Sequence, residues 1–146
     1  MSPENDKKLC EKYPKIFAQR GGSMLETCMF WGLAVGDGWY DLIDSLCLCL
    51  QHHADNAPLG TKPETYGWSE DAQAVAAQVK EKFGSLRFYT DGGDAVTYGM
   101  IQLAEVLSAR ICEDCGNKAT VRTKGYIRNL CGDCVDKQKA ASRRTP

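Results

Sequence analysis

The sequence lacks the long apolar runs that mark membrane or secreted proteins. Asp44 and Ser45 interrupt its most apolar stretch, from Leu42 to Leu50, so no run approaches the ~18 residues of a membrane helix. The first eight residues are polar, and we therefore expect no signal peptide and a cytoplasmic location. Internal repeats and low-complexity tracts are also missing. With 43% hydrophobic and 25% charged residues, the 146-residue chain has the composition of an ordinary globular domain.

Recognisable catalytic motifs are also missing. The two histidines are adjacent in sequence, and the chain contains no glycine-rich phosphate loop, nucleophile elbow or metalloprotease helix. We therefore expect a protein without catalytic activity. The sequence leaves one enzymatic alternative open, a phosphodiesterase or nuclease that uses Asp37, Asp41 or Asp94 with a divalent ion.

Cysteine, in contrast, is abundant, with eight residues in the chain. A chain of this length can bury a sufficient core without disulfides, and paired cysteines in a reducing cytosol favour metal binding. Four of them form a C-x2-C-x15-C-x2-C pattern, which is typical of zinc sites: Cys112, Cys115, Cys131 and Cys134. Because four thiolates saturate a tetrahedral ion, the pattern predicts a structural Zn²⁺ rather than a catalytic one.

The other four cysteines, Cys10, Cys28, Cys47 and Cys49, lack pair spacing. We interpret Cys47 as a core residue and Cys49 as its neighbour on the flank of a helix. A second metal site formed by Cys49, His52 and His53 is the alternative, because Cys49 and His53 stand four residues apart.

Apolar spacing and capping residues predict an α+β fold, with a helical body and short β-sheet over residues 1–111 and a zinc ribbon with a basic tail over residues 112–146. The sequence predicts a helix from Trp39 to Leu50 with Asp37 as its cap. A second predicted helix begins at a Ser69 cap and ends at Phe83, with Gly84 as its left-handed C-cap.

Further along the chain, Leu86 to Thr90 is rich in strand formers. Asp94 is then expected to cap a third helix, whose predicted buried face consists of Val96, Met100, Leu103, Ala104, Leu107 and Ile111. A short hairpin over residues 119–129 would join the two cysteine pairs, and a final helix would follow from Val135 to Ala141.

The charge is divided unevenly along the chain. Residues 1–111 carry 10 basic and 15 acidic side chains, whereas residues 112–146 carry 8 basic and 4 acidic ones. This basic segment makes a zinc-ribbon regulator that binds nucleic acid an alternative function, with Arg122, Lys124 and Arg128 as phosphate partners. Cations that merely keep a small metal module soluble would explain the charge equally well.

A second candidate surface interleaves cations with aromatic rings, a combination that can stack bases and neutralise phosphates. Its predicted ligand-binding residues are Lys80, Lys82, Arg87 and Tyr89, together with Trp39 and Tyr40 from the aromatic first half of the chain. The same aromatics could instead belong to the core.

Several segments together resemble a group of small uncharacterised proteins of tailed bacteriophages and prophages: Phe17, Cys28 to Gly32, Gly36 to Ile43, Gln78 to Tyr89, Ala104-Glu105 and Ile111 to Gly116. The resemblance extends from about Tyr13 to Cys134. It implies a viral accessory protein in the bacterial cytoplasm and brings no known activity or catalytic residue. We therefore expect a counter-defence or host-takeover protein that sequesters a nucleotide signal or binds and inhibits a host protein. Self-association into a homo-oligomer stays open.

Overall fold

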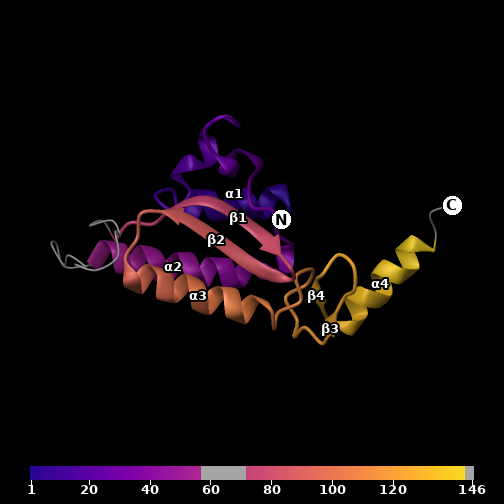
Figure 1. Ribbon diagram of the computed structural model, residues 1–146. Coiled ribbons are helices and arrows are strands. Elements are labelled where there is room, and N and C mark those ends of the chain that lie inside the picture. The colour runs from indigo at the N-terminus through magenta and orange to yellow at the C-terminus, as the bar shows by residue number, and fades with distance from the viewer. Residues whose placement is uncertain (57–71, 144–146) are drawn as a thin grey trace.

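The computed structural model describes residues 1–56 and 72–143, which form an α+β fold (Figure 1). The helices and strands, in chain order, are α1 (Pro3–Lys12), the 3-10 turns η1 (Ala18–Gly21), η2 (Cys28–Trp31) and η3 (Asp37–Trp39), α2 (Tyr40–Asn56), β1 (Val75–Lys82), β2 (Ser85–Asp91), α3 (Ala95–Ser108), β3 (Val121–Arg122), β4 (Asn129–Leu130) and α4 (Gly132–Ser142). None of the described helices is long and apolar enough to cross a membrane.

The antiparallel hairpin of β1 and β2 lies in the middle of the body, with α1 on one side and α2 and α3 on the other (Figure 1). Both outer edges of the hairpin are covered. Ala34 pairs with β1 through its N–H to the Val79 carbonyl at 2.9 Å. Along β2, the Leu86 N–H donates to Ser108 Oγ at 2.8 Å, so α3 satisfies part of the exposed strand edge.

The predicted helix over residues 70–83 is wrong, because Val75–Lys82 is strand β1. Its register with β2 shifts between Ala76 and Gln78, which is the signature of a β-bulge. The bulge separates buried Ala76 and Val79 by three residues, a spacing that imitates a helix. The Ser69 cap lies outside the described residues.

Gly84 does adopt the expected left-handed conformation, but in the hairpin turn rather than at a helix end. Phe83 and Gly84 have φ values of 53° and 79°, so both central residues of the turn are left-handed, as in a type I′ hairpin. Asn-Gly is the usual pair at these positions, and a phenylalanine there is strained. The Phe83 side chain is exposed.

The third predicted helix is confirmed, and the Asp94 carboxylate caps it by accepting from the Thr97 N–H at 2.9 Å. Of its predicted buried face, Ala104 is buried and Met100 and Ile111 are half-buried against the core, whereas Val96, Leu103 and Leu107 are exposed, which corrects the prediction for these three. The buried side consists instead of Thr97, Ile101, Ala104 and Ser108. Because α3 must approach the edge of β2 closely and supply acceptors there, its small and polar side faces inward.

The helix predicted from Trp39 to Leu50 is confirmed as α2, and of the apolar positions spaced for its buried face, Ile43, Leu46, Cys47 and Leu50 are buried, Leu42 is half-buried, and Trp39 is buried in the preceding turn η3. Asp37, however, does not act as its cap. The Asp37 carboxylate accepts from the Ser2 N–H at 2.8 Å and from the Asn5 amide at 3.1 Å, and it thereby fixes the start of α1. Ser2 and Pro3 begin that helix, which ends two residues before Pro14.

Candidate metal centre

The four cysteines of the C-x2-C pairs come together where α3 leads into the C-terminal module. The four sulfur atoms of Cys112, Cys115, Cys131 and Cys134 all lie within 4.8 Å of one another. All are free thiols, and Cys115 Sγ stands 3.5 Å from Cys131 Sγ. A tetrahedral ion with metal–sulfur bonds of ~2.3 Å requires sulfurs ~3.8 Å apart. The four residues can therefore hold one metal ion.

Local backbone geometry favours the thiolate form of one ligand, Cys112, whereas burial raises the pKa of the Cys134 thiol. Burial opposes ionisation of Cys112, but backbone N–H groups of Cys131, Cys115 and Asp114 outweigh it and lower the pKa of Cys112 to about 7. Gly116 closes the first knuckle by donating its N–H to the Cys112 carbonyl at 2.9 Å, with a left-handed φ of 82°. A left-handed φ favours glycine, so glycine is the residue best suited to the position directly after Cys115.

The module that contains these cysteines has little apolar core of its own. Strands β3 and β4 pair over only two residues each, as Val121 with Leu130 and Arg122 with Asn129. Besides the cysteines, only Leu130 and the half-buried Val135 pack in this cluster. Because so few apolar contacts cannot order a segment of this length, a bound ion would be a condition for its folding.

The Gly36-Asp37-Gly38 segment docks this centre onto the body. The Gly38 N–H donates to the Glu113 carbonyl at 2.8 Å, and the Trp39 indole N–H donates to the Ile111 carbonyl at 3.1 Å. A Cβ on Gly38 would lie 2.2 Å from the Cys112 carbonyl oxygen, and one on Gly36 would lie 2.1 Å from that of Glu113. Both glycines are therefore required by close backbone contact.

The β1–β2 turn makes the second contact with the metal module. The buried Asn129 amide donates to the Gly84 carbonyl at 2.6 Å, and the Tyr126 hydroxyl donates to Glu81 Oε2 at 2.7 Å. Arg122 Nη2 donates to the Phe83 carbonyl at 3.2 Å. Three segments far apart in the sequence, the Gly-Asp-Gly turn, the hairpin turn and the first knuckle, thus meet around one centre.

Of the three predicted phosphate partners, Arg128 is already engaged. Its Nε donates to Glu113 Oε2 at 2.9 Å and its guanidinium also pairs with Asp114, so the side chain braces the first knuckle. Arg122 and Lys124 are exposed on the ribbon hairpin.

Of the predicted ligand-binding residues, Lys80, Arg87 and Tyr89 lie together on the hairpin, where Lys80 and Arg87 are partners in the strand register. Trp39 is fully buried and belongs to the core, which corrects its assignment, and Tyr40 is half-buried beside it. The Arg87 guanidinium donates to its own strand and lies 3.6 Å from Glu105. Lys80 lies with its Nζ 5.7 Å from the centre of the Tyr89 ring, and Lys82 with its Nζ 5.8 Å from that of Phe83.

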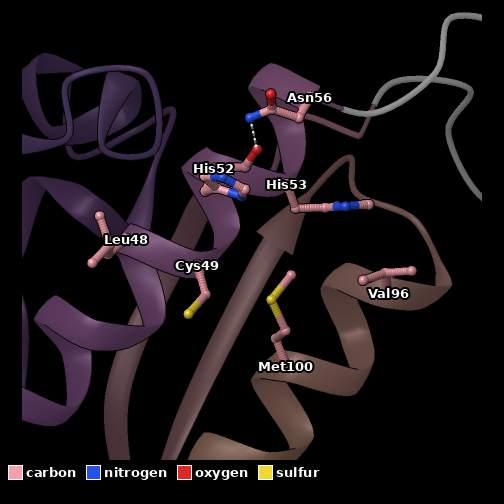
Figure 2. Close-up of a pocket in the computed structure, with 7 residues that line it drawn as sticks. All are labelled: Leu48, Cys49, His52, His53, Asn56, Val96 and Met100. Atoms are coloured by element: carbon pink, nitrogen blue, oxygen red, sulfur yellow. Dashed lines mark hydrogen bonds between the residues drawn. The ribbon is translucent and has the colours of Figure 1, made fainter.

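The alternative metal groupings are not assembled in the described part of the chain, where the four-cysteine group is the only cluster suited to an ion. Cys47 is buried as predicted, whereas Cys49 is exposed and its sulfur is directed away from the His53 ring (Figure 2). His53 instead contacts Asp94, at 2.7 Å between Nε2 and Oδ2. Asp37 and Asp94 thus have separate structural partners, and Asp41 lies in the first turn of α2.

The sequence interpretation missed one exposed feature, the loop between η1 and the end of η2. Its apolar tip consists of Met24, Leu25, Phe30 and Trp31, all of them exposed. The signal available was the run Met29-Phe30-Trp31, in which only Met29 is buried.

Comparison with protein-family models, curated proteins and solved structures found no match to this chain.

Proposed function

We propose that this chain is a non-enzymatic accessory protein of the phage type, which acts in the bacterial cytoplasm by binding and inhibiting a host protein. The observation that carries the proposal is the apolar tip. Leu25 is 92% and Trp31 71% exposed, and the Trp31 ring packs edge-on against Phe30 at 5.1 Å between centroids. Exposed tryptophan and clustered apolar side chains are characteristic of protein-binding hot spots.

The tip is held in place before any partner arrives. The buried Asp6 carboxylate accepts from Arg20 Nε at 3.0 Å and from the Leu33 N–H at 2.8 Å, and Arg20 also donates to the Phe30 carbonyl. Thr27 caps η2 by accepting from the Met29 N–H at 3.0 Å. A preorganised loop loses little conformational entropy on binding, which favours a tight interface.

The metal centre has a supporting role in this proposal. Four thiolates leave no open position for water or substrate, so the ion, which we assign as Zn²⁺ from the donor set, stabilises the fold. A protein partner is favoured over a nucleotide because the groove beside the predicted ligand-binding strand offers no cation to a phosphate. The groove beside Tyr89 is lined by α3 and β2 residues and contains none of the cations Lys80, Lys82 and Arg87.

Replacement of both Leu25 by Ser and Trp31 by Ala is expected to abolish partner binding without destabilising the fold, because both side chains are exposed. The tagged, zinc-loaded wild type should retain a bacterial protein from lysate, and the purified pair should then be measured by calorimetry. We expect a loss of at least ~30-fold in affinity, the effect of removing a hot spot.

The control is Leu103→Ser, which removes another exposed apolar side chain, from α3 on the far side of the hairpin. This variant should keep the partner. Capture of the same proteins by the wild type and the double variant, or tip-independent binding of a cyclic nucleotide in calorimetry, would contradict the proposal.

One observation favours nucleic-acid binding as a second candidate. The strained Phe83 is 63% exposed, and Tyr126 of the ribbon hairpin is 71% exposed near the same junction, beside the cations Lys82, Arg122 and Lys124. Strain of this kind persists where it serves a function, and two exposed rings among cations can stack single-stranded bases.

Phe83→Asn separates binding from stability at this junction. Asparagine suits the left-handed turn, so the thermal midpoint should stay the same or rise, while loss of the ring should weaken binding of a short single-stranded DNA about 10-fold. Fluorescence anisotropy at several salt concentrations measures this, with Trp31→Ala as the control. DNA binding that is absent at low salt, or unchanged in Phe83→Asn, would eliminate this candidate.

A further inference from the structure

Helix α3 carries an apolar stripe beside its buried side. Its small and polar side packs on the hairpin, whereas Val96, Met100, Leu103 and Leu107 follow three- and four-residue spacing on the side next to α2. Glu105 is the single charged residue of the helix. This spacing of apolar residues is the one used in helix–helix packing.

Helix α2 extends this stripe into a grooved surface. A hollow of about 160 Å³ lies between the helices and is lined by Leu42, Cys49, Met100 and Leu107, among others. A second hollow of about 680 Å³ continues from it past Cys49 and Met100 to Leu48 and Val96 (Figure 2). Leu48, Cys49, Val96, Met100, Leu103 and Leu107 define this α2/α3 face.

We propose that the α2/α3 face binds a second copy of this chain, so that α2 and α3 of both copies form a symmetric four-helix layer. Two-fold association brings each residue near the axis toward its own counterpart, so a charged face would repel itself. Among the described residues that line the two hollows there is no Asp, Glu, Lys or Arg. The larger hollow is also lined by His52 and by His53, which is paired with Asp94, whereas the narrow hollow is lined by apolar residues and Ser45 alone. The narrow hollow is therefore the part of the face that suits an identical surface.

The shape of the face is also complementary to itself. Leu103, which is 60% exposed, forms a ridge beside the narrow apolar hollow, so a two-fold axis can place the ridge of one copy in the hollow of the other. The four most exposed side chains, Leu48, Val96, Leu103 and Leu107, present roughly 400 Å² of surface, about half of the ~800 Å² per partner of a stable interface. Other exposed residues that line or border the hollows, such as Ser45, His52 and Asn56, add to this area.

This surface is distinct from the apolar tip. The tip lies above α1 in Figure 1, whereas α2 and α3 lie on the other side of the hairpin. The proposal therefore stands independently of the proposed function, and a dimer would present two tips at once.

Sedimentation equilibrium of the zinc-loaded chain tests the proposal. The wild type should show twice the chain mass of 16.1 kDa at concentrations of about 100 μM. Leu103→Asp puts a carboxylate into the apolar hollow of the other copy and should raise the dimer dissociation constant at least ~100-fold. Because Leu103 is exposed in the single chain, the variant should keep its zinc content and circular dichroism.

Val96→Lys, at the other end of the face, provides a second variant with the same expectation. Leu25→Asp, which puts a charge on the tip, is the control and should remain dimeric. A wild type that sediments as a monomer, or a dimer that persists in both Leu103→Asp and Val96→Lys, overturns the proposal.

Discussion

Cys112→Ser is expected to release the metal ion and to unfold residues 112–142, while the body keeps its secondary structure. Cys112 is fully buried and contributes one of four clustered sulfurs, so a hydroxyl in its place leaves the tetrahedral set incomplete. Binding of zinc supplies on the order of 10 kcal/mol to the folding of comparable small modules. The body has a separate core around Trp39, Ile43 and Leu86, which does not include these cysteines.

Metal analysis and hydrogen exchange measure the two parts of this prediction. We expect about one zinc per wild-type chain and at least a ~100-fold weaker affinity in the variant, with loss of amide protection in β4 and α4 but not in β1. A strong chelator should have the same effect on the wild type. Cys28→Ser is the matched control, because Cys28 is exposed and lies outside the cluster. Equal zinc content and protection in Cys112→Ser and Cys28→Ser would refute a structural metal centre.

Gly38→Ala is expected to destabilise the protein strongly. The added methyl group would lie 2.2 Å from the Cys112 carbonyl oxygen, 2.4 Å from the Gly116 nitrogen and 2.7 Å from the Cys115 nitrogen. These are backbone atoms of the metal-binding knuckle, which cannot move without separating the knuckle from the body. We expect a loss of about 3 kcal/mol or more in the free energy of unfolding.

Chemical denaturation of the zinc-loaded proteins measures this loss. Gly99→Ala provides the control, because Gly99 lies within α3 and no atom is found within 4 Å of its added Cβ. That variant should be stabilised by about 0.5 to 1 kcal/mol through its higher helix propensity. If Gly38→Ala proves as stable as Gly99→Ala, the close contact between the knuckle and the Gly-Asp-Gly turn is incorrect.

The four clustered cysteines could be predicted because the two C-x2-C pairs are a short-range pattern in the sequence. Two residues between cysteines suffice to place both thiols on one turn, whatever the rest of the chain does. Helix α2 and the cap of α3 were predicted for the same reason, since their signals lie within a few residues of the elements that they specify.

The β1 strand could not be predicted in this way because its pattern of buried residues depends on its pairing with β2. The bulge near Ala77 exists only in the register with β2, and it converts a strand into an apparently helical pattern. In α3, likewise, the periodicity alone does not decide which side of the helix is buried. Ile101 is buried and Leu103 is exposed because Ser108 and Glu105 accept hydrogen bonds from N–H groups at the edge of β2.

The sequence by itself determined the four-cysteine centre, the class of the fold and the absence of a long apolar span, because each depends on composition or short spacing. The tertiary structure decided why Gly36, Gly38 and Gly84 are glycines, since each meets the metal module from a distant part of the chain. It also decided which apolar residues are buried and which remain on the tip and the α2/α3 face. Burial is a property of the assembled elements, and a one-dimensional pattern records only that a side chain is apolar.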